Sequence, residues 1–89
     1  MPGLPLEIRS FPNPFSSAAT IQYSVASSGH VRLRVYDVAG RLVATLVDTS
    51  LEPGRYSADL RGARLSAGVY LIEGKFGDQR ITRKCVLVR

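Results

Sequence analysis

Apolar and polar residues alternate with a period of two along most of this chain, and turn-forming residues interrupt the alternation at short intervals. Successive side chains of a β-strand point to opposite faces of its sheet, so this pattern is typical of strands with one buried face. No stretch keeps a helical period between helix caps. The alternation predicts seven strands, at residues 6–11, 20–25, 30–37, 41–47, 55–60, 69–76 and 79–88.

The length of the chain and its single cysteine limit how these strands can be held together. Its 89 residues suit one domain, and short strands at this spacing favour an all-β antiparallel sandwich. Cys85 has no second cysteine with which to form an internal disulfide. One cysteine and one histidine also fall short of the roughly four ligands of a structural zinc site. The sandwich must therefore be stabilised by its apolar core.

The third and fourth predicted strands differ in their patterns. In the third, valine or leucine at every second position faces inward, and Arg32, Arg34 and Tyr36 face outward. The fourth contains the run Leu42-Val43-Ala44, which is apolar on both faces. Strands that are apolar on both faces are typical of the interior of a sheet, so the fourth strand is predicted to lie near the sheet centre.

Three breaks in the alternation have the composition of defined turns. Asp37 and Gly40 suit the first and last positions of a type I turn. Pro53 and Gly54 suit the two central positions of a type II turn. Gly77 suits the first central position of a two-residue type II′ hairpin.

Pro12, Asn13 and Pro14 cannot continue a strand ladder. The two prolines remove two backbone donors, and Asn13 is held extended by the proline after it. Turn chemistry explains each residue, so the segment is predicted to be a stiff corner. A recognition element is the alternative.

The last predicted strand carries apolar residues and a charge on both of its faces. A bulge could change its face midway, but the pattern favours burial of Cys85 and Leu87. Lys84, Val86 and Val88 would then form an outward row of one cation and two apolar side chains. Such a row fits an edge strand protected by lysine, and it fits equally a surface that engages a partner.

The net charge of +5 permits nucleic-acid, phospholipid or anionic-glycan partners. Arg32, Arg34 and Tyr36, together with Arg80 and Arg83, could form a cationic patch with an aromatic for single-stranded nucleic acid. The charges are spread along the chain rather than gathered in one motif, which favours a solvated sheet face instead.

The sequence contains no arrangement that indicates catalysis or a bound cofactor. His30 follows a glycine at a strand start without a nearby carboxylate in the sequence, and is predicted to be an exposed turn histidine. There is no phosphate-binding loop and no dinucleotide-binding motif, and a sandwich of this size offers no deep pocket. No apolar run approaches the roughly 20 residues of a membrane helix, and none has the form of a signal peptide. Residues 1–5 are predicted to be a leader or linker before a single domain at residues 6–89.

Several short motifs occur in a fixed order along nearly the whole chain. They are Pro-Asn-Pro-Phe at 12–15, Ser-Ala-Ala-Thr-Ile at 17–21, Val-Arg-Leu-Arg-Val-Tyr-Asp at 31–37, Gly-Arg-Leu-Val at 40–43, Pro-Gly at 53–54, Leu-Ser-Ala-Gly-Val-Tyr at 65–70 and Arg-Lys-Cys-Val-Leu-Val at 83–88. The ordered set resembles the type IX secretion (Por system) C-terminal sorting domain, type A. It is also similar to the immunoglobulin-like repeat named after the flagellar hook-capping protein.

The resemblance implies an immunoglobulin-like, Greek-key sandwich of about seven strands without catalytic activity. Such a module targets a larger secreted protein through the type IX machinery and the periplasm to the cell surface. The implied partners are the translocon, sortase-like components, anionic lipopolysaccharide, and an upstream catalytic or adhesive domain in cis. Gly40, Gly68, Val69 and Tyr70 belong to the implied family signature, whereas Cys85 stands where a larger apolar residue is common.

Two other classes of function fit the same sequence. One is a structural immunoglobulin-like spacer or carbohydrate-binding module of an extracellular enzyme. The other is a basic nucleic-acid-binding barrel, which salt-dependent binding of oligonucleotides would reveal. A sorting domain must be the last domain of its parent protein, whereas a spacer can occupy any position.

Overall fold

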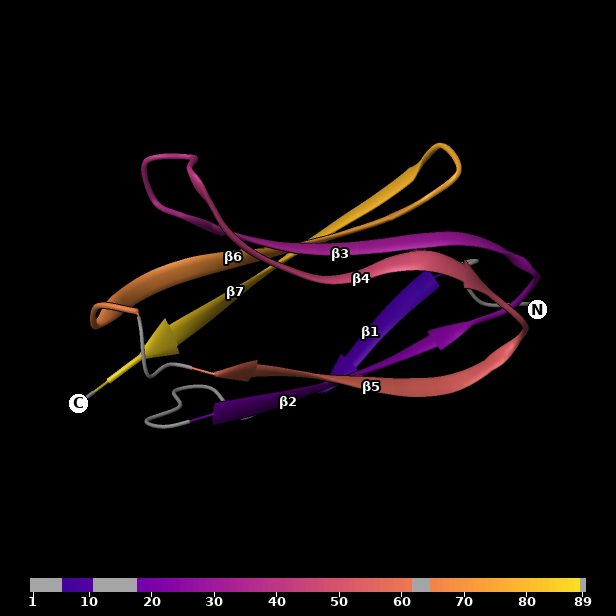
Figure 1. The fold of residues 1–89 in the computed structure, drawn as a ribbon, viewed down its shortest axis with the longest axis horizontal. Helices are drawn as coiled ribbons and strands as arrows, with labels where there is room; N and C mark the ends of the chain where they lie inside the picture. The colour runs from indigo at the N-terminus through magenta and orange to yellow at the C-terminus, as the bar shows by residue number, and fades with distance from the viewer. Residues whose placement is uncertain (1–5, 11–17, 62–64, 89) are drawn as a thin grey trace.

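The strands form two antiparallel sheets that lie one on the other with an apolar core between them (Figure 1). The computed structural model describes residues 6–10, 18–61 and 65–88. The prediction of seven strands is confirmed, although several ends differ by a few residues. The strands are β1 (Leu6–Ser10), β2 (Ala18–Val25), β3 (Gly29–Asp37), β4 (Leu42–Leu51), β5 (Gly54–Arg61), β6 (Gly68–Phe76) and β7 (Gln79–Leu87).

One sheet has three strands in the order β1-β2-β5, and the other has four in the order β4-β3-β6-β7. The connections from β2 to β3, from β4 to β5 and from β5 to β6 therefore pass from one sheet to the other. These crossings, with every pairing antiparallel, give the predicted immunoglobulin-like Greek-key sandwich. β1 packs against β6 and β7, and β5 packs against β4 on the other side.

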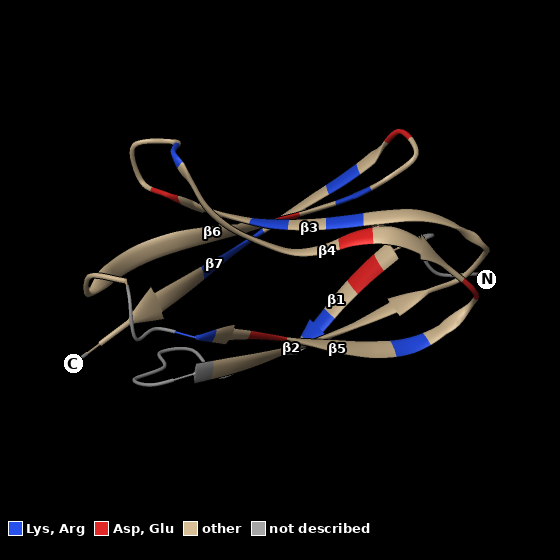
Figure 2. Ribbon diagram, viewed as in Figure 1, with Lys and Arg blue, Asp and Glu red and all other residues tan. Residues whose placement is uncertain are grey.

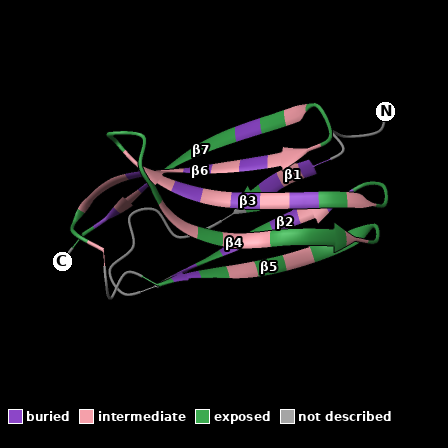
Figure 3. Ribbon diagram, turned by 45° about the horizontal axis from the view of Figure 1, so that its top comes forward, coloured by how far each residue is buried: buried purple, intermediate pink, exposed green. Residues whose placement is uncertain are grey.

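The core consists of the inward residues of both sheets, and buried residues recur at every second position in the middle of β3 and β6 (Figure 3). In β3 the alternation is complete, as predicted, because its three inward apolar residues are fully buried. No polar or charged residue is buried in the part of the chain that the structure describes. The buried set is Leu6, Ile8, Ala19, Ile21, Tyr23, Val25, Val31, Leu33, Val35, Leu60, Tyr70, Ile72, Ile81, Cys85 and Leu87.

The predicted place of the fourth strand is wrong, because β4 is an edge strand of the four-stranded sheet. The register between β3 and β4 shifts twice, and Val43 and Leu46 have no residue directly opposite them in β3. Each shift is a bulge, and a bulge moves the residues after it to the other face. The apolar run Leu42-Val43-Ala44 therefore reflects the bulge at Val43 in an edge strand rather than burial on both faces.

The last strand needs no bulge, because β7 pairs with β6 without any shift of register from Gly68–Leu87 to Phe76–Gln79. Cys85 and Leu87 are buried, as the favoured interpretation predicted. Arg83 shares their inward register but is exposed. It lies among the residues at the open side of the sandwich beside β1, where its charge stays in contact with solvent.

Two of the three predicted turns have the expected geometry. Gly40 N–H donates to the carbonyl of Asp37 at 3.0 Å, and Gly40 has a φ of 86°. This combination is a type I turn followed by a left-handed residue. Gly77 has a φ of 58°, and among the described residues only glycines have a positive φ, so the φ of Asp78 is negative. A positive φ at the first central residue and a negative one at the second match a type II′ hairpin.

The type II turn predicted at Pro53-Gly54 is wrong. Gly54 has a φ of 157°, far from the value of about +80° that a type II turn requires at this position. Gly54 is already the first residue of β5, where it pairs with Val25. The proline and glycine therefore form a wide bend that carries the chain from one sheet to the other.

Candidate recognition surfaces

Lys84, Val86 and Val88 form the outward row that the sequence predicts, because Cys85 and Leu87 between them point into the core. Lys84 is exposed, Val86 is half-buried, and Val88 is 43% exposed just beyond the end of β7. The outward row was predicted on the condition that Cys85 and Leu87 are buried, and both are buried. Its role in binding a partner stays a prediction.

The register of the sheet extends this row into a larger surface. Val86 lies opposite Val69, and in the next outward row Leu71 of β6 lies between Lys84 of β7 and Tyr36 of β3. Tyr36 in turn lies opposite Leu42 of β4, which is 49% exposed. Five outward side chains therefore form a continuous apolar surface, which we call the apolar strip: Leu42, Tyr36, Leu71, Val69 and Val86.

Sequence reasoning did not identify Leu42 or Leu71 as part of this surface. Alternation within a strand shows which residues share a face, but it does not show which residues of neighbouring strands lie opposite each other. The pairing of Leu71 with Lys84 depends on the register of β6 and β7. That register is fixed by the two-residue turn at Gly77, which is visible in the sequence.

The other half of the same face is charged. Arg32 lies opposite Lys75 and Asp48, and Arg34 lies opposite Glu73. The Nε atoms of both arginines are buried without a hydrogen-bond partner in the described part of the chain. Their aliphatic stems thus lie close to the sheet, as arginine stems often do.

The predicted cationic patch is only partly assembled. Arg32, Arg34 and Tyr36 share the outer face with Arg80, which forms an ion pair with Glu73 at 3.6 Å. Arg83 does not join them, because it has the inward register of β7. Lysine and arginine are also distributed over both sheets (Figure 2).

His30 is exposed, as predicted, but it does have a carboxylate partner. Its Nε2 lies 2.5 Å from Oδ1 of Asp48 on β4. The two residues are 18 positions apart in the sequence, and only the pairing of β3 with β4 brings them together.

Gly40 of the family signature completes a turn that the side chain of Asp37 closes. Asp37 closes its turn with Oδ1, which accepts hydrogen bonds from the N–H groups of Ala39 and Arg41 at 3.0 and 2.9 Å. The bond from the Arg41 backbone is the main reason why the pKa of Asp37 is lowered. Gly40 follows in the left-handed conformation that completes this turn.

The requirement for glycine at position 68 does not come from crowding. A Cβ atom at this position would meet nothing within 4 Å. Its φ of 153° is a backbone conformation that other residues rarely adopt, so the requirement for glycine is conformational. A role of Gly40, Gly68, Val69 or Tyr70 in recognition stays a prediction.

Tyr70 fills the core next to this glycine and ends in a hydrogen bond. The residue is 5% exposed, and its hydroxyl donates to the carbonyl oxygen of Ser66 at 2.6 Å. A tyrosine near the start of the sixth strand that bonds to the backbone a few residues upstream is the tyrosine corner of immunoglobulin-like sandwiches. The hydrogen bond holds the connection between β5 and β6 against the core.

We expect Tyr70→Phe to lower the free energy of unfolding by about 1 kcal/mol, because the Ser66 carbonyl loses its donor while the ring stays in place. Urea denaturation followed by circular dichroism measures this change. Tyr36→Phe, on the outer face, is the matched control and should leave the midpoint unchanged. Equal stability of Tyr70→Phe and the wild type would show that the hydroxyl contributes nothing.

The remaining features of the described residues do not form a chemical site. No group of three or more histidine, cysteine, aspartate or glutamate residues lies close enough there to hold a metal ion. Burial raises the pKa of the Cys85 thiol, which lowers its reactivity. None of the described segments forms a helix with the length and apolarity needed to cross a membrane. Pro12, Asn13 and Pro14 lie outside the described residues.

Comparison with known proteins supports the family that the order of motifs suggests. The family model described as "Secretion system C-terminal sorting domain" matches residues 9–88. No curated protein and no solved structure matches the chain. Because the match covers all but the two ends, the chain belongs to the type IX secretion C-terminal sorting domain family.

Proposed function

We propose that this domain is a non-catalytic module that targets an upstream catalytic or adhesive domain through the type IX machinery to the outer-membrane exterior. The supporting observation is the family match over residues 9–88, which implies export and interaction with that machinery. In this proposal the cargo passes through the periplasm. Sortase-like components then act on it at the surface and couple it to anionic lipopolysaccharide.

We also propose that the machinery recognises the apolar strip together with Lys84 and Val88. These side chains lie around the outer face of β7 and the strands beside it. An exposed apolar surface bordered by a cation suits a protein partner, because apolar contacts supply affinity and the charge supplies orientation. A structural edge strand would need only the lysine.

Lys84→Ala and Val86→Thr should trap a reporter fusion in the periplasm of a type IX-competent host. Both side chains face outward, so each change should lower the free energy of unfolding by about 1 kcal/mol or less. Cell fractionation of the reporter gives its location, and thermal melting of the purified domain gives its stability.

The matched control changes the same face of the same strand outside the apolar strip. Arg80→Ala and Thr82→Ala lie on the charged half of the face, opposite Lys75 and Glu73. They should leave delivery to the surface unchanged. If the Lys84 and Val86 variants also reach the surface normally, the terminal strand is only a structural edge and recognition must lie elsewhere.

A further inference from the structure

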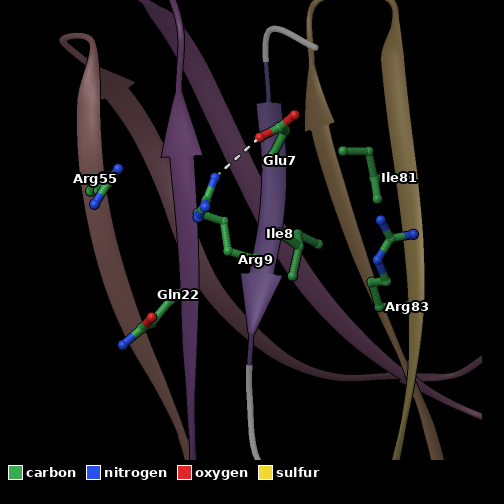
Figure 4. A pocket seen from close by; sticks show the side chains of 7 residues that line it. All are labelled: Glu7, Ile8, Arg9, Gln22, Arg55, Ile81 and Arg83. Atoms are coloured by element: carbon green, nitrogen blue, oxygen red, sulfur yellow. Dashed lines mark hydrogen bonds and ion pairs between the residues drawn. The ribbon is translucent and has the colours of Figure 1, made fainter. Parts of the chain in front are cut away.

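A groove of about 590 Å³ crosses the open side of the sandwich, where β1 and β7 are the edges of their sheets. Figure 4 shows that its side chains come from β5, β2 and β1 of one sheet and from β7 of the other. The groove lies on a different part of the molecule from the apolar strip. Its lining residues are Glu7, Ile8, Arg9, Gln22, Arg55, Ile81 and Arg83.

The groove is strongly cationic. Three guanidinium groups and one carboxylate line it, which leaves a net charge of +2. The carboxylate of Glu7 lies 3.5 Å from Arg9, and both side chains are partly exposed. Among the described residues, Arg55 and Arg83 form no ion pair. Two guanidinium groups are therefore available to an anion from outside.

Arg83 is the least expected member of this group. It lies at an inward position of β7 between Ile81 and Cys85, which are both buried. A guanidinium at such a position would be costly under a closed sheet, and here it is exposed at the open edge. Its best hydrogen bond there is a long one of 3.5 Å to the neighbouring Thr82 carbonyl.

Between the arginines, two isoleucine side chains and the backbone side of β1 that pairs with no described strand line the gap from β1 to β7. Ile8 and Ile81 are 6% and 8% exposed. The side-chain amide of Gln79 accepts a hydrogen bond from Leu6 N–H and donates one to the Leu6 carbonyl, each at 2.8 Å. The N–H and C=O groups of Leu6 thus point away from β2. Those of Ile8 also point away from β2, because the backbone groups of every second residue in a strand point to the same side.

We propose that this groove binds an acidic peptide segment of a partner protein. Carboxylates of the peptide would meet Arg55, Arg9 and Arg83 in turn, since arginine pairs with carboxylate in a two-bond geometry. An apolar peptide side chain would rest on Ile8 and Ile81, and the peptide backbone would bond to that of Ile8. None of the residues that line this groove is aromatic, and the nearest tyrosines, Tyr23 and Tyr56, line an adjoining hollow and stack on each other. This arrangement favours a peptide over nucleic-acid bases, which bind by stacking on exposed aromatic side chains.

The spacing of the strands suggests the sequence of such a peptide. From β5 to β1 the groove crosses two strand spacings, roughly 10 Å, which is about one turn of a polyproline II helix, whose side chains return to the same face every third residue. The probe is therefore a fluorescein-labelled heptapeptide with glutamate at its first, fourth and seventh positions. A peptide with glutamine at those positions is its neutral counterpart. The proposal does not depend on the sorting function.

Fluorescence anisotropy with the whole chain should show binding of the acidic peptide and not of the neutral one. The triple variant Arg9→Gln, Arg55→Gln and Arg83→Gln should weaken binding about tenfold. The matched control, Arg61→Gln, Lys75→Gln and Arg80→Gln, removes the same charge from other surfaces. It should change the affinity less than about twofold, because distant exposed charges are screened by salt.

Amide resonances of Ile8 and Arg83 should shift on titration with the acidic peptide in heteronuclear NMR spectra. Three results would overturn the proposal. The first is an absence of peptide binding, and the second is equal weakening by both triple variants, which would indicate only the overall charge. The third is tighter binding of a single-stranded oligothymidine that is lost in the groove variant, which would assign the groove to nucleic acid.

Discussion

Cys85→Asp is expected to unfold the domain at room temperature. Cys85 is 0% exposed and lies in the core of the four-stranded sheet, opposite Tyr70 on β6. An unpaired carboxylate at this position loses its hydration without gaining a partner, which costs several kcal/mol. A domain of this size has a net stability of only a few kcal/mol, so the penalty is comparable with the whole. Circular dichroism and the dispersion of amide resonances would both show the loss of structure.

Two further variants separate the effect of position from that of chemistry. Thr82→Asp introduces the same carboxylate on the exposed face of β7 and should remain folded. Cys85→Ala removes only the buried sulfur and should be destabilised by much less than Cys85→Asp. If Cys85→Asp melts within a few degrees of the wild type, the inward register of β7 is wrong. The outward placement of Lys84 and Val86 would then be wrong as well.

Strand positions and inward faces follow from the sequence because each depends on residues within one strand. The inward residues of β3 are fully buried, and Cys85 and Leu87 point inward as their alternation favours. The same reasoning failed for β4, where two bulges carry apolar residues onto both faces. A bulge shifts the alternation by one residue, and a short apolar run does not distinguish this from a central strand.

Relations between strands could not be predicted in the same way. Asp48 is remote from His30 in sequence and meets it only through the pairing of β3 with β4. The grouping of Arg83 with Arg80 failed for a different reason, because two residues three positions apart in one strand lie on opposite faces, which the alternation within β7 already implies. The groove also depends on the difference between a sheet of three strands and one of four. The pattern of residues within single strands does not show how many strands each sheet contains.

Gly74→Val is expected to destabilise the domain by about 2–3 kcal/mol, because it overfills the core beneath β1. Gly74 is buried on the inner face of β6, and a Cβ atom there would lie 3.0 Å from methyl groups of both Leu33 and Leu6. The position looks like an ordinary inward strand position in the sequence. Only the close approach of the other sheet shows why it holds glycine.

The matched substitutions at this site test whether space or backbone freedom requires the glycine. Gly74→Ala adds one methyl group, whose tight contacts are offset by the roughly 0.5–1 kcal/mol gained when a strand glycine is replaced. Its stability should therefore stay within about 1 kcal/mol of the wild type. Valine adds two more methyl groups, favours strands intrinsically, and can be accommodated only if β1 moves outward. Urea denaturation should give a large loss of stability for valine and a small change for alanine, whereas similar stabilities for both would mean that the two sheets are not packed tightly here.

Since β1 carries Ile8 and Arg9, the valine variant should also weaken binding of the acidic peptide under conditions where it remains folded.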